Sequence, residues 1–238
     1  MNTSRGKPAK YGQEIVKRRF RITSNRINLN GKKILDFGCG DGAQTIEIAK
    51  SNVTIIAVDI DYDDIQAFKE HISLNNINNI TAIKYDGKTL PIKSNSIDLV
   101  VSYEVLEHVH NESDSLQELY RVLKQGGEIL ISVPNKWWLF ETHGAYLPIL
   151  QWNRAPFFSW LPHSIHNKFA KARIYKKKEI VKLLIANGFL IKNCTYITAP
   201  MDVIKNKKLK KILRNLIFRD DETRCAFLST AILVHGQK

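Results

Sequence analysis

The sequence predicts an α/β fold in which a doubly wound, mostly parallel sheet carries helices on both faces. Short apolar runs rich in β-branched residues alternate with segments of helical period along the first 135 residues. The runs are continuously apolar, which is typical of strands buried on both faces. Strand and helix alternate at a spacing that indicates βαβ units. The 238 residues are 44% hydrophobic and 25% charged, which suits one globular core.

The first part of the chain holds five predicted strands and three predicted helices. The strands are residues 32–38, 54–60, 80–86, 97–103 and 127–134. The helices are residues 43–50, 62–75 and 112–124, the last ended by the glycine pair at 126–127. Ahead of them, residues 1–30 form a basic segment that we expect to be helical.

The texture of the sequence changes after Pro134. All four tryptophans lie between residues 135 and 165, where no clear period is visible, so we expect an aromatic-rich cap insertion over 135–175. A helix follows at 176–187, and two further strands are predicted at 189–199 and 225–235. Between these strands, residues 202–219 form a basic amphipathic insertion. We assign the whole chain, 1–238, to one domain.

A glycine-rich loop follows the first strand, in the stretch "ILDFGCGDGA" (34–43). Gly38 permits a tight turn there, and Gly40 lets backbone N–H groups approach a ligand closely. Asp59 ends the second strand, where a carboxylate can accept hydrogen bonds from two ribose hydroxyls. A nicotinamide dinucleotide and an adenosine-containing cofactor of another kind both fit these features. An NAD-dependent oxidoreductase therefore stays open at this point.

Acidic residues at three strand ends favour the second kind of cofactor. Asp36, two residues before the first glycine, would repel a pyrophosphate but could hold a cation such as an α-ammonium. Asp86 ends the third strand, where it could accept from an adenine amine. Glu104 and His108 lie at the rim of the same cleft, after the fourth strand. S-adenosylmethionine combines an amino-acid end, a ribose and an adenine, and it fits this arrangement.

The stretches "ILDFGCGDG", "VDID", "KYDGKTLPIKSNSIDLVVSYEVLEHV" and "LYRVLKQGGEILISVPN" together resemble the class I S-adenosylmethionine-dependent methyltransferases. The resemblance covers about residues 30–135, with a weaker continuation at 170–190, and is closest to the quinone- and sterol-modifying group. It implies a Rossmann-like sheet of seven strands with an antiparallel final hairpin. It also implies S-adenosylmethionine as methyl donor, S-adenosylhomocysteine as product, and no metal.

Carried over by position, the resemblance assigns a set of cofactor contacts. The methionine end would lie on Asp36, Gly38, Gly40 and the chain at Tyr103 and Glu104; the ribose on Asp59; and the adenine on Ile60, Asp86 and Gly87. Cys39 belongs to the same loop, where we expect it to serve loop geometry more than side-chain contact.

The acceptor side of the site is predicted from the cap and two histidines. Clustered aromatics indicate an apolar acceptor pocket, with Trp137, Trp138 and Trp152 as candidate contacts, unless they only pack the cap onto the domain. His143 and His108 are the candidate bases, because a near-neutral imidazole suits proton removal from a hydroxyl. His143 is also a candidate acceptor contact, and His108 could instead make a structural hydrogen bond. Methyl transfer does not always need a base.

Positive charge is concentrated in segments that flank this core. The chain has 36 Lys and Arg against 23 Asp and Glu, a net charge of +13. Residues 202–219 hold seven of the basic residues and one acid. This insertion could pack on the sheet edge, lie on an anionic membrane surface, or contact RNA. RNA is the less favoured interpretation, because the end of the fourth strand lacks the Asn/Asp-Pro-Pro-aromatic signature that positions a base amine in many nucleic-acid methyltransferases.

The function expected from the sequence is methyl transfer to a small-molecule or lipid-linked acceptor, most plausibly at an oxygen of a quinone-like, isoprenoid or glycan group. An RNA methyltransferase and an NAD-dependent oxidoreductase are the alternatives. Three widely spaced cysteines and the lack of a secretory signal or an apolar span favour the cytoplasm, with peripheral attachment at the inner membrane face as an option. The sequence does not predict an oligomeric state.

Overall fold

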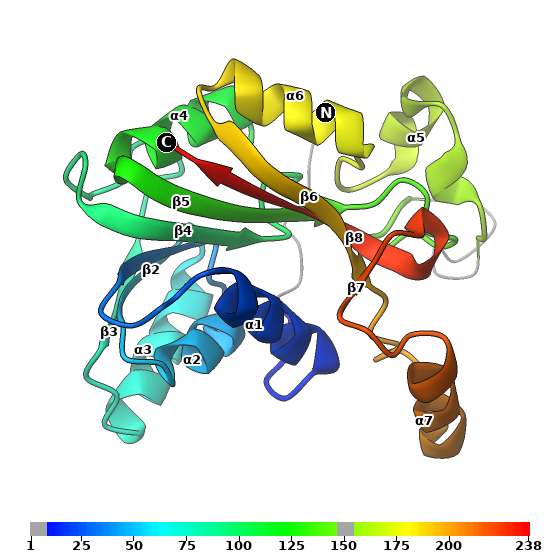
Figure 1. Cartoon of the computed structure of the whole chain (residues 1–238), viewed down its shortest axis with the longest axis horizontal. Coiled ribbons are helices and arrows are strands. Elements are labelled where there is room, and N and C mark those ends of the chain that lie inside the picture. Colours follow the sequence, from blue (N-terminus) through cyan, green and yellow to red (C-terminus); the bar gives the residue numbers. More distant parts are fainter. Residues whose placement is uncertain (1–8, 147–154) are drawn as a thin grey trace.

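A computed structural model describes residues 9–146 and 155–238. Its centre is an eight-stranded sheet with the order β3-β2-β1-β4-β5-β8-β6-β7 (Figure 1). Strands β1 to β5 pair in parallel, whereas β8 runs antiparallel to both of its neighbours, β5 and β6. The doubly wound class and the antiparallel pair near the C-terminus are therefore confirmed.

The strands follow the predicted ones closely, with three differences, one of which is that the last strand begins at Ser229, after a 3-10 turn at Ala226–Leu228, and not at 225. Their bounds are β1 Lys33–Phe37, β2 Thr54–Asp59, β3 Ile80–Lys84, β4 Ile97–Tyr103, β5 Leu123–Pro134, β6 Leu190–Thr198, β7 Glu222–Thr223 and β8 Ser229–Gln237. Strand β5 begins four residues before the predicted start, because Leu123 already pairs with Ile97 of β4 ahead of an irregularity at the glycine pair. The eighth strand is the two-residue β7, which pairs with Tyr196 and Ile197 of β6 and is too short to leave a sequence pattern.

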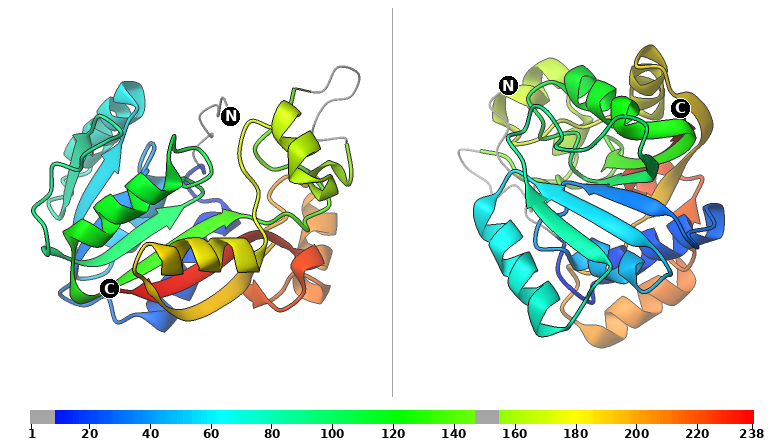
Figure 2. Two further views of the ribbon diagram at one scale, coloured as in Figure 1. Left: turned by 90° about the horizontal axis from the view of Figure 1, so that it is seen from above. Right: turned by 90° about the vertical axis from the view of Figure 1, so that its left-hand side faces the viewer.

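Helices cover both faces of the sheet (Figures 1 and 2). Their bounds are α1 Glu14–Arg26, α2 Ala43–Ala49, α3 Tyr62–Leu74, α4 Glu112–Val122, α5 His163–Phe169, α6 Lys177–Ala186 and α7 Lys207–Leu216. Side chains of α4 and α6, such as Leu116 and Ile180, form one buried cluster with the sheet. Side chains of α1, α2 and α3, such as Ile22, Ile48 and Phe68, form a second cluster.

The order of the sheet fixes where a ligand can bind. After β1 the chain adds β2 and β3 on one side, and then returns to add β4 and β5 on the other. Ligands of such sheets bind beyond the carboxyl ends of the strands, at the point where the order reverses. The loops after β1, β2 and β4 meet there.

Helix α7 occupies the position of the predicted basic insertion but does not pack on the sheet edge. None of its ten residues is buried, and it projects from the rest of the described chain (Figure 1). Phe218, which follows it, is 7% exposed and anchors the end of the segment. The packing interpretation is therefore wrong for the helix itself. None of the helices in residues 9–146 and 155–238 has the length and apolar content needed to cross a lipid bilayer.

Candidate active site

A cavity of about 450 Å³ lies at the switch point of the sheet. Small-molecule sites span roughly 300–1,000 Å³, so its size suits a nucleoside-containing ligand. It is lined by Ala9, Gln13, Arg19, Asp36, Gly38, Cys39, Gly40, Ala43, Gln44, Asp59, Ile60, Asp64, Tyr103, Glu104, Val105, His108 and His143. The structure thus brings most of the predicted cofactor residues, and both predicted histidines, to one cavity.

Asp36 provides a buried negative charge at this cavity. Asp36 is the penultimate residue of β1, and its side chain is 2% exposed. It accepts a 2.6 Å hydrogen bond from the Thr45 hydroxyl. Burial is the main reason that its pKa rises to about 6, and the neighbouring Asp59 adds to the rise. Close by, Gln44 Oε1 is buried and has no hydrogen-bond partner among the described residues. A ligand ammonium group would satisfy both residues.

The glycine loop is held against Asp59. The backbone N–H groups of Gly40 and Asp61 donate to the two carboxylate oxygens at 2.8 and 3.0 Å. A carboxylate offers about four acceptor positions, so further bonds to ribose hydroxyls remain open. Gly38 has a φ of +78°, and a Cβ there would lie 2.3 Å from Val105 Cγ2. Only glycine fits that position.

Cys39 has a structural role in this loop. Its side chain is buried, and its thiol lies 3.6 Å from the carbonyl oxygen of Gly40. Burial raises the pKa of the Cys39 thiol well above its ordinary value. The thiol is therefore neutral and packs within the loop.

The predicted adenine contacts lie at the rim. Ile60 lines the cavity and is 55% exposed. Its apolar side chain is therefore available to pack against a planar ring. Gly87 lies beside it, since a Cβ on Gly87 would be 3.5 Å from Ile60 Cγ2. Asp86 is exposed and does not belong to the cavity lining. It accepts hydrogen bonds from the N–H groups of Lys88 and Thr89, which lower the pKa of its carboxyl.

The end of β4 supplies the opposite wall. Tyr103 is buried, with its hydroxyl bonded to Thr23 and its ring 5.2 Å from the Arg19 guanidinium. Glu104 has a φ of +60°, a left-handed conformation that is strained for a non-glycine residue. Its carboxylate accepts from the Ser132 hydroxyl at 2.9 Å and lies 3.7 Å from Arg19. The turn that follows Glu104 contributes Val105 and His108 to the lining of the cavity.

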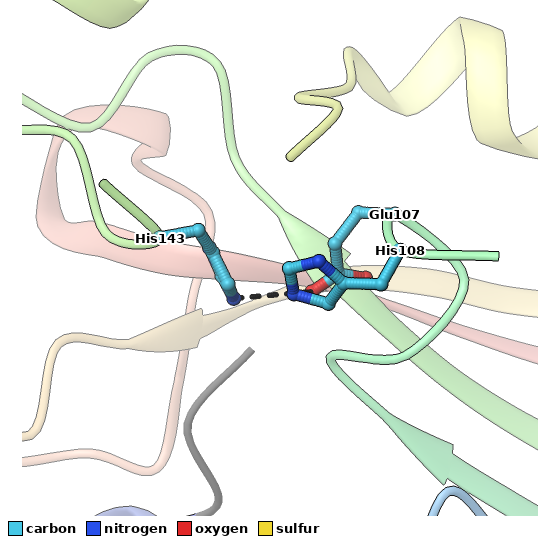
Figure 3. A group of neighbouring side chains, drawn as sticks. All are labelled: Glu107, His108 and His143. Carbon is cyan, nitrogen blue, oxygen red and sulfur yellow. Dashed lines mark ion pairs between the residues drawn. The ribbon is translucent and has the colours of Figure 1, made fainter. Parts of the chain in front are cut away.

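Glu107, His108 and His143 form a compact group beside Glu104 (Figure 3). His143 Nε2 lies 3.1 Å from Glu107 Oε1 and 3.4 Å from Glu104 Oε2. Burial alone would lower the pKa of His143, but the nearby carboxylates outweigh it and raise the pKa to about 9. Burial raises the pKa of Glu107, and His143 opposes that rise. The donor atoms of the three residues lie within 4.8 Å of one another and could hold a metal ion.

The cap positions His143 through a buried carboxylate. Glu141 accepts hydrogen bonds from the backbone N–H groups of Thr142 and His143 at 2.9 and 3.0 Å. Its other oxygen lies 2.8 Å from Nε2 of His166 on α5, and both of these side chains are almost fully buried. Thr142 Oγ1 lies 2.8 Å from His143 Nδ1, which fixes the ring with Nε2 toward Glu107. Helix α5 had no signal in the sequence.

Two of the predicted tryptophan contacts, Trp137 and Trp138, are not among the described residues that line the cavity. Trp137 packs against Trp160 and Phe227, with ring centroids 6.2 and 6.5 Å apart. The Trp138 carbonyl accepts from the Ser159 hydroxyl, within the cap. These aromatics therefore pack the cap onto the C-terminal part of the chain. Trp152 lies outside the described residues.

Two residues of the site, Glu107 and Arg19, were not predicted from the sequence. Glu107 lies three residues after Glu104 and next to His108, and that spacing within "EVLEHV" was a usable signal. Arg19 comes from α1, ahead of the first predicted strand at 32–38, and no motif pointed to it. Its position depends on how α1 packs over the sheet, which is a tertiary property.

With this geometry established, comparison with known proteins identifies the family. A family model described as a methyltransferase domain matches residues 28–217. A demethylmenaquinone methyltransferase from Corynebacterium efficiens is 33% identical over 123 residues, which cover 51% of this chain and 50% of that protein. A mitochondrial ubiquinone biosynthesis O-methyltransferase from Rattus norvegicus is 34% identical over 112 residues, covering 45% and 32%. The chain therefore spans half or less of the length of these curated relatives.

A solved structure of similar fold supports the same assignment. A SAM-dependent methyltransferase from Aquifex aeolicus superposes with a TM-score of 0.62 at 14% identity, covering 94% of this chain and 90% of the other. The similarity in fold therefore covers nearly the whole chain, whereas the similarity in sequence to the curated relatives covers about half of it. The family model covers most of the chain and favours methyl transfer over hydride transfer. The chain belongs to the methyltransferase domain family, and its fold is that of a SAM-dependent methyltransferase.

Proposed function

We propose that this enzyme methylates an oxygen atom of a small, lipid-linked acceptor at an anionic membrane surface. The observation that carries the proposal is helix α7, an exposed helix that is both strongly basic and apolar on one side. Methyl transfer itself, with S-adenosylmethionine as donor, is a property of the family.

Helix α7 has the composition of a helix that lies in a membrane interface. Four lysines, at positions 207, 208, 210 and 211, lie within its first five residues. Leu209, Ile212 and Leu216 recur at helical spacing and are 46%, 53% and 77% exposed, and Ile217 just after the helix is 51% exposed. An apolar stripe flanked by lysines binds anionic lipid by burying the stripe and pairing the charges.

A tether links α7 to a segment that reaches the cavity. Asp202 accepts from the backbone N–H groups of Glu14 and Ile15 at the start of α1, and it pairs with Arg214 of α7 at 2.8 Å. Gln13, immediately before them, lines the cavity. An acceptor whose lipid chain stays in the membrane could therefore reach the cavity with its polar head.

Lipid is favoured over RNA as the partner of α7. Exposed aliphatic side chains gain free energy by leaving water for an acyl layer, at about 25 cal/mol per Å². RNA recognition relies instead on cations and on aromatic stacking. The stripe of α7 contains leucine and isoleucine and no aromatic residue.

An oxygen acceptor is supported by the charged group at the end of the cavity. His143 Nε2 lies 3.4 Å from a carboxylate oxygen of Glu104 and 3.1 Å from one of Glu107. The carboxylates of this group can accept the proton that a phenolic or catecholic oxygen must lose on methylation, and the protonated His143 can donate a hydrogen bond to that oxygen. The name of the rat relative, a ubiquinone biosynthesis O-methyltransferase, agrees with this chemistry.

The cofactor fills the other part of the same cavity. In our proposal Asp36 binds its ammonium group, Asp59 its ribose hydroxyls and Ile60 one face of its adenine. The loop of Gly38, Cys39 and Gly40 and the chain at Tyr103 and Glu104 surround its methionine end, while Asp86 and Gly87 close the adenine edge. His108 and His143 then lie on the acceptor side.

The test compares two acceptors that differ only in the lipid chain. Transfer of a labelled methyl group from S-adenosylmethionine is measured for a prenylated catechol in vesicles containing phosphatidylglycerol, and for the same catechol without its prenyl chain. We expect an alkali-stable ether as the product and a rate at least tenfold higher for the prenylated acceptor. Equal rates for both acceptors, or label in an alkali-labile ester, would contradict the proposal.

Variants of α7 separate membrane binding from catalysis. Replacing Lys207, Lys208 and Lys211 with Gln should weaken vesicle binding by about 3 kcal/mol, or roughly 100-fold, at about 1 kcal/mol for each lysine. Ile212→Glu should have a similar effect by removing the apolar contact. Leu74→Glu, at an 82% exposed position at the end of α3, is the matched control and should bind vesicles normally. Retained vesicle binding in the lysine variant together with binding to RNA would favour the alternative.

A further inference from the structure

We propose that Glu107, His108 and His143 bind a divalent transition-metal ion, and that this ion binds the hydroxyl oxygen of the acceptor. The inference deepens the proposed function and rests on it for the identity of the acceptor. The metal site itself depends only on the geometry of these three side chains.

The three donor groups have a spacing that an ion can close. His143 Nε2 and His108 Nε2 lie 3.1 and 3.9 Å from Glu107 Oε1, and all three donors lie within 4.8 Å of one another (Figure 3). Metal–ligand bonds of about 2.0–2.2 Å place neighbouring donors about 3–3.5 Å apart. Small side-chain rotations therefore suffice to form the site.

Glu107 is the independent sign that a cation belongs there. Its side chain is 0% exposed, and neither carboxylate oxygen has an aligned hydrogen bond with any described residue. A buried carboxylate of this kind is costly unless it is paired or coordinates a metal. The contact with His143 provides partial compensation, and an ion would provide more.

His143 is held in the way that metal-binding histidines are held. Ligating imidazoles commonly use the second ring nitrogen in a hydrogen bond that fixes the ring. Here Thr142 Oγ1 lies 2.8 Å from Nδ1, and Glu141 holds the backbone of the same turn. Nε2 is thereby directed at Glu107.

The donor set indicates both the class of metal and its use. Two imidazoles and one carboxylate suit Zn²⁺, Mn²⁺ or Co²⁺ better than Mg²⁺, which prefers oxygen ligands. Three protein ligands leave a coordination position open. Because His108 and His143 line the cavity, that position faces the acceptor.

The bound ion would lower the pKa of the coordinated acceptor hydroxyl, so that its proton passes to solvent water. The resulting oxygen attacks the methyl carbon, an O–CH₃ bond forms, and the S–CH₃ bond of the sulfonium breaks. The products are the methyl ether, neutral S-adenosylhomocysteine and one proton. No oxidant or reductant is needed.

Metal binding is tested on the full chain by titration calorimetry with Mn²⁺ and Zn²⁺, with Mg²⁺ for comparison. A Cys225→Ser background removes the exposed thiol, which could bind Zn²⁺ by itself. We expect one equivalent of Mn²⁺ or Zn²⁺ to bind. Glu107→Gln and His143→Asn should each weaken binding by at least tenfold, since even outer-shell changes cost roughly 10–100-fold.

His110→Asn, at an exposed position two residues after His108, is the matched control and should bind metal like the parent. Binding of S-adenosylhomocysteine confirms that each variant is folded. Absence of stoichiometric binding in the parent, or equal binding in all variants, would overturn the inference.

Activity separates this inference from the function on which it rests. Stoichiometric metal binding without methylation of the prenylated catechol would refute that acceptor and leave the metal site standing. Undiminished methylation in the presence of a strong chelator would refute the metal site and leave the acceptor standing.

Discussion

The two ends of the cavity are built in different ways. At the cofactor end, Asp36 and Asp59 are placed by the ends of two neighbouring strands, and each carboxylate accepts defined hydrogen bonds. At the acceptor end, Glu107 is equally buried but has no aligned hydrogen bond among the described residues, and His143 is positioned by a cap. The cofactor end is thus complete within the sheet, whereas the acceptor end depends on segments added to it.

This difference explains which part of the site can vary. The cofactor is common to the family, and the strand ends that hold it are part of the fold itself. The acceptor group depends on the turn after β4, the loop at 141–143 and α5, so changes in the cap can alter the acceptor without disturbing the cofactor. Variants at one end should therefore leave the other end largely intact.

The largest effect is expected from Gly38→Ala. Its φ of +78° and the contact of a new Cβ with Val105 at 2.3 Å should together cost about 2–4 kcal/mol in the glycine loop. We expect binding of S-adenosylhomocysteine, measured by titration calorimetry, to fall by roughly 30- to 700-fold, since each 1.4 kcal/mol is about a factor of ten.

The double variant Gly38→Ala with Val105→Ala is the control for this clash. It removes the contacts at 2.3 and 2.6 Å with the valine methyl groups, leaves Val105 Cβ at 3.0 Å and keeps the unfavourable φ, so affinity should recover only in part. Full recovery would show that the conformation of Gly38 is unimportant, and unchanged affinity in Gly38→Ala alone would remove the loop from the cofactor site.

Asp59→Asn should have the next largest effect. The amide keeps the shape of the carboxylate but loses the charge and one acceptor oxygen for the Gly40 and Asp61 N–H groups. Loss of hydrogen bonds to a charged group costs about 1.5–3 kcal/mol, so cofactor affinity should fall roughly 10- to 100-fold in calorimetry. Asp63→Asn, an exposed position on α3, should bind normally. Equal affinities in the two variants would contradict the ribose assignment.

The same contrast accounts for what the sequence could predict. Asp36, Gly38 and Asp59 are fixed by strand ends, and strands leave a clear apolar pattern, so the cofactor end could be located from short motifs. Trp137 shows the opposite case, because an aromatic residue in an insertion packs equally well on the cap or in a pocket. Arg19, α5 and β7 depend on tertiary packing, which local patterns do not encode.

Asp36→Asn should change cofactor affinity and the free energy of unfolding in opposite directions. The pKa of Asp36 is about 6 in the folded protein, above its ordinary 3.8, so the folded state binds more protons than the unfolded state between these values. The free energy of unfolding of the parent should therefore fall as the pH rises from about 4 to about 6, and stay lower above that.

The Asp36→Asn variant should lack the part of this fall that Asp36 contributes, keep the part that Glu107 contributes, and gain about 1–3 kcal/mol over the parent at pH 7, since one pKa unit corresponds to about 1.4 kcal/mol. Urea unfolding at pH 4, 5, 6 and 7 measures the effect. Cofactor affinity should decrease in the same variant, because the cation loses its counter-charge. A variant that is less stable than the parent at pH 7 would show that the Asp36 carboxylate is not destabilising in the empty site.

Thr142→Val tests the acceptor end with the smallest expected effect. Valine keeps the shape of the side chain but cannot bond to His143 Nδ1, so the ring loses the contact that directs Nε2 toward Glu107. One such hydrogen bond contributes about 1 kcal/mol, so kcat should fall about fivefold. Binding of S-adenosylhomocysteine should stay unchanged, because Thr142 is not among the described residues that line the cavity. A parallel loss of cofactor affinity would show that the two ends are coupled through the turn after β4, and that the cap also helps to form the cofactor site.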